Sequence, residues 1–136
     1  MHAETQVMDS QTLIKIAKEA GKSILSIYND PQLSTEVDYK SDDSPLTLAD
    51  QRSNDVIIAG LEQAGNELPI LSEEMKHAEY AERKNWSEFW LIDPLDGTKE
   101  FIKRTGQFTV NIALVEGSRP ILGVIYVPAR DELYFA

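Results

Sequence analysis

The order of apolar and polar residues predicts helices first and strands afterwards. Between residues 11 and 29 the apolar residues recur every three or four positions, which is the spacing of one helix face. Asp9 or Ser10 can cap the beginning of this helix, and the polar, proline-containing stretch 29–31 ends it. Gly21 lowers the helix propensity of the middle, so we expect a close packing contact there. The apolar positions are Leu13, Ile14, Ala17, Ile24, Leu25 and Tyr28.

A second helix is expected from residue 47 to about residue 64. Thr47 and Asp50 have the spacing of a capping box at its beginning. Gly65 is suited to the position that ends a helix, because glycine adopts the left-handed conformation without strain. The polar residues between the two helices predict a loop.

Short apolar runs follow, and these are typical of strands. We expect strands at residues 68–71 and 89–92, the second one ending where Asp93 begins a polar turn. Residues 108–114 alternate between apolar and smaller or polar side chains, and residues 120–127 form the return strand of a hairpin. Two helices followed by hairpin-connected strands predict an α+β fold, with two N-terminal helices packed on a mostly antiparallel sheet.

The length of 136 residues fits one domain, and 42% hydrophobic residues are enough for a core. We expect residues 1–10 to be a flexible lead-in and residues 11–136 to form the folded unit. A further strand begins at Leu133, but the chain stops at Ala136 with neither a partner nor a polar tail. Because that leaves an apolar edge unpaired, we expect the sequence to be truncated at its C-terminus.

Charge and composition exclude several classes of function. The chain has 13 Lys and Arg against 23 Asp and Glu, a net charge of −10, which argues against nucleic-acid binding. It has no cysteine, which excludes disulfides, thiolate zinc sites and cysteine nucleophiles and suits a reducing cytoplasm. It has no apolar run long enough for a membrane span and no signal-peptide pattern at its start. We therefore expect a cytoplasmic protein.

Four carboxylates stand at the end of an expected strand or the beginning of an expected helix: Asp50, Glu73, Asp93 and Asp96. Ligands commonly bind at such strand ends and the loops after them. Asp93 and Asp96 lie three residues apart across a Pro-Leu turn and can point into one space, where a cation would relieve their repulsion. Oxygen donors without cysteine favour Mg²⁺.

The residues after this pair suit a phosphate. Gly97 allows a tight turn that exposes backbone N–H groups, and Thr98 adds a hydroxyl that can orient a water molecule. Simpler interpretations stay open for each part. The D-x-x-D-G-T segment can be a capped turn without metal, Glu73 can be a solvated surface residue, and Asp50 can be an acid that complements a helix dipole.

Together these segments resemble the inositol monophosphatase superfamily of Mg²⁺-dependent, lithium-sensitive phosphomonoesterases. The resemblance is carried by Leu48-Ala49-Asp50, by Leu71-Ser72-Glu73-Glu74 and by W-L-I-D-P-L-D-G-T at residues 90–98. The stretches K-E-F-I-K-R at 99–104 and F-T-V-N-I-A-L at 108–114 are similar to the bacterial 3'(2'),5'-bisphosphate nucleotidase branch, the CysQ type. The resemblance covers residues 11–136 and matches the first half of the family's length.

The resemblance implies the front half of the family's layered α/β sandwich and a hydrolase acting on adenosine 3',5'-bisphosphate, a nucleotide by-product of sulfur metabolism. The 3'-phosphate would be removed to give AMP and phosphate. It further implies that Glu73, Asp93 and the Leu95 carbonyl bind one Mg²⁺, that Asp93 and Asp96 bind a second, that Asp50 and Thr98 are catalytic and act on the attacking water, and that Gly97 and Thr98 bind the substrate phosphate.

Two alternatives remain beside this interpretation. One is an inositol-phosphate phosphatase of the same superfamily, against which Lys99-Glu100 argue because that branch tends to have a small polar residue there. The other is a non-catalytic metal-binding or interaction module. In the family, the second half supplies another metal-binding aspartate and much of the nucleoside pocket, so the activity of this chain alone stays open. The resemblance also allows a location peripheral to the inner membrane, and the unpaired sheet edge allows self-association.

Overall fold

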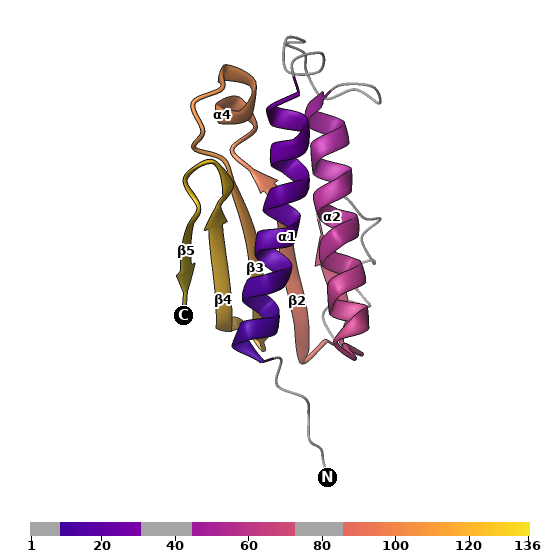
Figure 1. Ribbon diagram of the computed structural model, residues 1–136. Helices are drawn as coiled ribbons and strands as arrows, with labels where there is room; N and C mark the ends of the chain where they lie inside the picture. The colour runs from indigo at the N-terminus through magenta and orange to yellow at the C-terminus, as the bar shows by residue number, and fades with distance from the viewer. Residues whose placement is uncertain (1–8, 31–44, 73–85) are drawn as a thin grey trace.

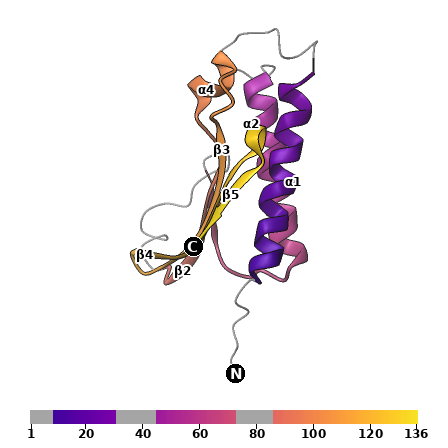
Figure 2. The same ribbon diagram turned by 60° about the vertical axis from the view of Figure 1, so that its left-hand side comes forward.

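The computed structural model describes residues 9–30, 45–72 and 86–136 of the chain. Two long helices lie side by side and cover one face of a sheet of five strands (Figure 1). Turning the molecule shows the helices and the sheet as two separate layers (Figure 2). Within the described ranges this arrangement confirms the predicted α+β fold with two N-terminal helices on a mostly antiparallel sheet.

The first helix, α1, spans Ser10–Tyr28, as its apolar spacing predicts. Asp9 is its N-cap, and the Asp9 side chain accepts a hydrogen bond from the backbone N–H of Gln11 at 3.3 Å. Most of the predicted lead-in, residues 1–8, lies outside the described residues. The helix face toward the sheet is buried and consists of Leu13, Ile16, Ala17, Ala20, Gly21, Ile24, Ile27 and Tyr28.

Gly21 confirms the predicted close contact. A Cβ atom at this position would lie 2.5 Å from a ring carbon of Tyr126 and 3.0 Å from Cγ of Pro128. Contacts this short do not occur between real side chains, so α1 can approach the sheet at this point only through a glycine.

The second helix, α2, spans Pro45–Gln63 and begins two residues before the predicted start. The predicted capping box is therefore wrong: Thr47 lies inside the first turn and is buried, and Asp50 lies one turn further along. Pro45 is a favourable first residue because its fixed φ and missing N–H cost nothing at a helix start. Gly65 follows the helix with a φ of +89°, in agreement with its predicted role.

The sheet has the order β1-β2-β3-β4-β5. The short strand β1, Ile70–Ser72, runs parallel to β2, Glu88–Asp96, and the other neighbours are antiparallel. The predicted hairpin is present as β3, Thr109–Glu116, and β4, Arg119–Val127. A short helix, α4, Thr98–Lys103, follows β2, and a 3-10 turn, η1, Pro128–Arg130, leads into the edge strand β5, Glu132–Phe135.

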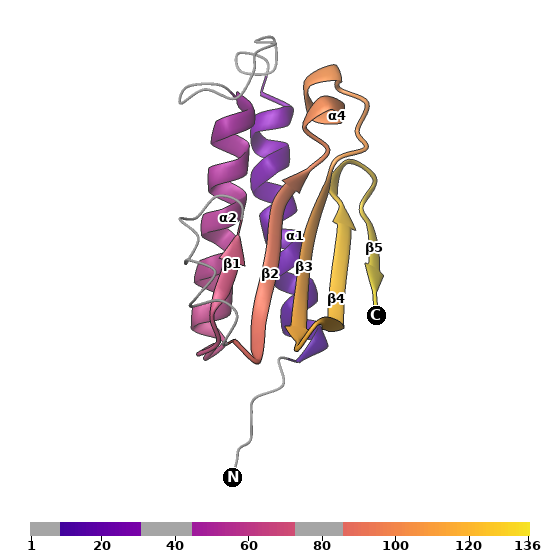
Figure 3. The ribbon, with the colours of Figure 1, turned by 180° about the vertical axis from the view of Figure 1, so that it is seen from behind.

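The two faces of the sheet differ in burial. Trp90, Ile92 and Ile112 point toward the helices, with no more than 2% of their surface exposed, and they belong to one core with residues of α1 and α2. The opposite face is visible from behind, where the strands lie in front of the helices (Figure 3). Leu91 and Ile125 on that face are 45% and 44% exposed. In the part of the chain that the structure describes, each helix is too short or too polar to cross a bilayer.

Candidate active site at the end of strand β2

Strand β2 does not end at Asp93, as the sequence pattern predicts, but continues to Asp96. Asp93 pairs with Asn111 of β3, and Asp96 pairs with Thr109. The register therefore advances three residues along β2 and two along β3, so β2 carries one extra residue at this point. This is a β-bulge, and it contains Pro94, which has no N–H to offer to the ladder.

The bulge decides where the two carboxylates lie. In a regular strand, residues three apart point to opposite faces. Asn111 and Thr109 are two apart and share one face, and the side-chain amide of Asn111 donates to Thr109 Oγ1 at 2.9 Å across that face. Because Asp93 and Asp96 are their partners in the ladder, both aspartates lie on this same face, which is the one turned away from the helices.

The bulge is anchored on its helix side. Pro94 and Leu95 are buried, and the Leu95 side chain, 1% exposed, is part of the core. Ser53 of α2 donates a buried hydrogen bond of 2.7 Å to the carbonyl oxygen of Pro94. A backbone group that the bulge removes from the ladder is thus satisfied by a side chain of the neighbouring layer.

Asp50 lies on the same side of α2 as Ser53, since residues three apart on a helix are neighbours. Only 1% of Asp50 is exposed. Figure 3 shows that the beginning of α2 and the end of β2 lie at the same end of the molecule. The fold thus brings Asp50 toward the strand end that carries Asp93 and Asp96, although 43 residues separate Asp50 from Asp93 along the chain.

Glu73 lies outside the described residues, but the residue before it is well defined. Ser72 ends β1 and is in register with Ile92, directly before Asp93. Its hydroxyl donates to Asn54 Oδ1 of α2 at 2.6 Å. This bond holds the last residue of β1 against α2, beside the strand that carries Asp93.

Gly97 connects β2 to α4 in the left-handed region, with a φ of +97°. The positive φ requires glycine, and a Cβ atom here would also lie in tight contact, 3.1 Å from Glu100 Oε1 and 3.2 Å from the Cα of Phe108. Thr98 begins α4 with an exposed side chain. The turn that the sequence predicts after Asp96 is therefore present.

Of the predicted site residues, the structure gathers Asp93, Asp96, Gly97 and Thr98 at the end of one strand, and it places Asp50 on α2 at the same end of the molecule. Within the described ranges no three histidine or acidic side chains form a ready metal-binding group. The available donors are carboxylate oxygens and a backbone carbonyl, which are the donors that Mg²⁺ prefers.

The sequence pattern assigns no role to three polar residues that the structure buries: Ser53, Asn54 and Ser72. The signal was present for two of them, because Ser53 and Asn54 follow Asp50 at the three- and four-residue spacing of one helix face. A polar stripe on a helix face that packs against a sheet indicates polar partners in the sheet.

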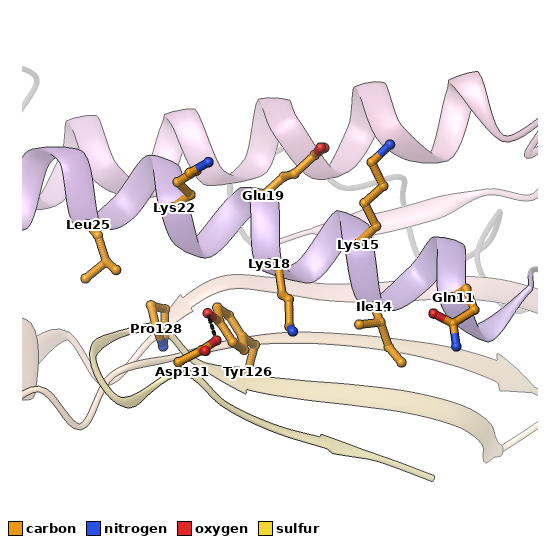
Figure 4. Close-up of a pocket in the computed structure, with 10 residues that line it drawn as sticks. All are labelled: Gln11, Ile14, Lys15, Lys18, Glu19, Lys22, Leu25, Tyr126, Pro128 and Asp131. Carbon is orange, nitrogen blue, oxygen red and sulfur yellow. Dashed lines mark hydrogen bonds between the residues drawn. The ribbon is translucent and has the colours of Figure 1, made fainter.

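A separate hollow of about 560 Å³ lies between α1 and the chain around η1 (Figure 4). Lys18 points into it toward Tyr126 and Asp131, whereas Lys15, Glu19 and Lys22 point away from the sheet. None of its lining residues belongs to α2, β1 or β2, so it is distinct from the carboxylate site. Its lining consists of Gln11, Ile14, Lys15, Lys18, Glu19, Lys22, Leu25, Tyr126, Pro128 and Asp131.

Comparison with known proteins gives a consistent family. A family model described as the inositol monophosphatase family matches residues 6–136. A 3'(2'),5'-bisphosphate nucleotidase CysQ from Salmonella typhimurium is 46% identical over 93% of this chain and 50% of its own length. The corresponding protein of Escherichia coli K12 is 46% identical over 90% of this chain and 49% of its own length.

Solved structures agree with these sequence matches. The crystal structure of CysQ from Bacteroides thetaiotaomicron superposes with a TM-score of 0.84 at 51% identity, covering 93% of this chain and 45% of that protein. An inositol monophosphatase from Zymomonas mobilis superposes with a TM-score of 0.70 at 34% identity, covering 92% of this chain and 45% of that protein. The chain spans about half the length of the relatives that it matches.

Proposed function

Because this chain belongs to the inositol monophosphatase family, we propose that it forms the first half of a phosphatase that removes the 3'-phosphate of adenosine 3',5'-bisphosphate. The products would be AMP and phosphate, which recycles a by-product of sulfur assimilation. The observation that carries the proposal is the bulge in β2, which turns Asp93 and Asp96 to one face directly before the Gly97 turn. The names of the 46% identical relatives support the choice of a bisphosphate nucleotide as substrate.

The donor set fits a divalent cation, and we assign Mg²⁺. Glu73, Asp93 and the Leu95 carbonyl would hold one Mg²⁺, and Asp93 and Asp96 would hold a second. The bound cation would offset charge on the phosphate oxygens and make the attacking water more acidic. The protein's part is to keep these oxygen donors on one face, where without a cation the two aspartates repel each other.

The remaining site residues act on the water and the phosphate. Asp50 and Thr98 would orient the attacking water, and Asp50 would accept its proton as general base. The low exposure of Asp50 supports this role. A buried carboxylate is shielded from bulk water, which would otherwise compete with the attacking water for its oxygens. The backbone N–H groups of Gly97 and Thr98 would donate to the phosphate oxygens.

An inositol-phosphate phosphatase is the second candidate, favoured by the shared fold of the Zymomonas mobilis enzyme. Its lower identity of 34% and the Lys99-Glu100 pair favour the nucleotide instead. A non-catalytic module is the third candidate, because the chain spans half the length of its relatives.

We place the protein in the cytoplasm, in keeping with the absence of cysteine.

The test is phosphate release with Mg²⁺ from adenosine 3',5'-bisphosphate and from inositol 1-phosphate, with and without lithium. It is run on this chain alone and on this chain joined to the second half of a CysQ relative. We expect lithium-sensitive release from the nucleotide in the joined protein. Release from inositol 1-phosphate alone would support the second candidate, and no release from either substrate would support the non-catalytic module.

Asp93→Asn provides the internal check on the site. We expect it to lower kcat/KM by about 100-fold or more, because it removes a charge that would hold the cation at the developing phosphate charge. Asp55→Asn is the matched control, since Asp55 is an exposed acid on α2. Near-normal turnover in the Asp93 variant would remove this residue from the site.

A further inference from the structure

Two buried residues of α2 hold the ends of both strands that lead into the candidate site. Ser53 is 0% exposed and donates to the Pro94 carbonyl oxygen at 2.7 Å. Asn54 is 7% exposed and accepts from the Ser72 hydroxyl at 2.6 Å. The first bond joins the helix to the bulge of β2, and the second joins it to the last residue of β1.

The bond from Ser53 fixes the bulge at a point that the sheet does not hold. Pro94 and Leu95 have no partner residues in β3, because the register shift lies between Asp93 and Asp96. A buried carbonyl without a partner is costly, so the Ser53 hydroxyl is the group that stabilises this peptide in its orientation. This bond holds Pro94, and the buried side chain holds Leu95 in the core. Together they fix the direction in which the Leu95 carbonyl and the Asp96 side chain point.

The bond to Asn54 does the same for the neighbouring strand. Ser72 is level with Ile92, and the residues that follow them are Glu73 and Asp93. Holding Ser72 against α2 therefore fixes the last residue of β1 beside Ile92, the residue before Asp93. A single turn of α2 thus sets the positions of two strand ends that meet at the same edge of the sheet.

We propose that Ser53 and Asn54 are positioning residues that fix the end of β2, and the last residue of β1 beside it, so that the oxygen donors of Asp93, Leu95 and Asp96 suit a divalent cation. They act through the backbone from the helix side and do not touch the cation. The proposal rests on the metal site of the proposed function. Its physical reason is that like charges separate unless their backbone is held, and the Ser53 bond holds the bulge between Asp93 and Asp96 from the helix side.

The test measures metal affinity and not turnover. The dissociation constant for Mn²⁺, as a probe of the Mg²⁺ site, is measured by isothermal titration calorimetry on the full 136-residue chain. We expect Ser53→Ala to raise this constant by about 10-fold, in the range found when groups that orient metal ligands are removed. Amide hydrogen exchange at Asp96 and Gly97 should also become faster in Ser53→Ala before any metal is added.

Two controls separate positioning from general stability. Ser23→Ala removes a hydroxyl that also donates to a backbone carbonyl at 2.7 Å, but this carbonyl belongs to Ala20 of the same helix. Ile57→Val removes one methylene group from the buried face of α2, one turn beyond Ser53. Both should leave the Mn²⁺ constant unchanged. If Ser53→Ala does not fold, Asn54→Ala is used in its place, with the same expected direction.

The outcomes are distinct. Equal Mn²⁺ affinity in Ser53→Ala and the unsubstituted chain would overturn the positioning role and leave the metal site intact. An equal loss in Ile57→Val would also overturn it, because general destabilisation would then explain the effect. If the unsubstituted chain binds no Mn²⁺, the proposed metal site itself fails in this chain, and the positioning role fails with it.

Discussion

Tyr126 lies beneath α1 with 7% of its surface exposed, and its hydroxyl donates to Asp131 Oδ1 at 2.6 Å. Burial, and after it the hydrogen bond and the charge of Asp131, raises the pKa of Tyr126 from 10.0 to about 12. The pKa is higher in the folded chain than in the unfolded one. This group therefore contributes its full stabilisation below pH 10, and the contribution is lost as the pH rises toward 12.

This pKa predicts how stability changes at alkaline pH. Between pH 10 and pH 12 the unsubstituted chain should lose roughly 2–3 kcal/mol of unfolding free energy that Tyr126→Phe does not lose. Urea unfolding at a series of pH values measures the difference between the two proteins. Tyr134→Phe is the control, because Tyr134 is 58% exposed. Parallel pH profiles for the unsubstituted chain and Tyr126→Phe would contradict the assignment.

The short helix α4 is stabilised by contacts with the end of α1, because six residues are too few for a helix that is stable by itself. Its Phe101 packs with Tyr28 and Phe108, with ring centroids 4.8–5.4 Å apart within this cluster. Arg104, at the end of α4, donates to the Tyr28 carbonyl oxygen at 2.9 Å and lies 4.2 Å from the centre of the Tyr28 ring. A six-residue helix is not stable alone, so these contacts position the turn that contains Gly97 and Thr98.

We therefore expect Arg104→Ala to lower the free energy of unfolding by about 1 kcal/mol, since the cation–π contact and the hydrogen bond are both lost at an exposed site. Arg104→Lys keeps the charge but not the planar group, so its free energy of unfolding should lie between those of the unsubstituted chain and Arg104→Ala. Lys103→Ala, an exposed neighbour on the same helix, is the control. The prediction fails in denaturant unfolding if the Arg104 and Lys103 variants lose the same amount.

The sheet as a whole has one face covered by helices and one face with exposed apolar side chains. Leu91, Ile125 and Tyr134 share the second face, because Leu91 lies two residues before Asp93, and Asp93, Asn111, Ile125 and Tyr134 follow one another across the ladder. Exposed apolar groups gathered on one face are typical of a contact surface. Since the relatives are about twice as long, we expect the part of them that this chain does not match to cover this face.

This predicts binding between the chain and the separately produced second half of a CysQ relative. Leu91→Lys and Ile125→Lys should weaken the complex by at least about 10-fold in sedimentation velocity, because each places a charge in an apolar contact. Ser118→Lys, in the exposed turn between β3 and β4, is the control. Association of the chain only with itself, unaffected by either substitution, would indicate the β5 edge and contradict the proposed contact.

Much of the fold can be predicted because it depends on local patterns. The helical spacing of Leu13 to Tyr28 and the alternation of residues 108–114 each determine an element from a short stretch of chain. The close contact at Gly21 was also predictable from a local pattern. Glycine lowers helix propensity, so a glycine in the middle of a helix indicates a neighbour too close for a side chain. The family was predictable from the residues around Asp50, Glu73 and Asp93, all of which lie within residues 6–136 that the family model matches.

What the sequence by itself determined is therefore the two long helices, the main strands, the fold class and the family. The tertiary structure alone decided that Asp93 and Asp96 share a face, because that requires a bulge, and a bulge exists only relative to its partner strand. It also decided that Ser53 and Asn54 hold the ends of the strands, since these contacts join residues distant along the chain. Periodicity describes one segment at a time, whereas register and contacts between layers depend on two segments together.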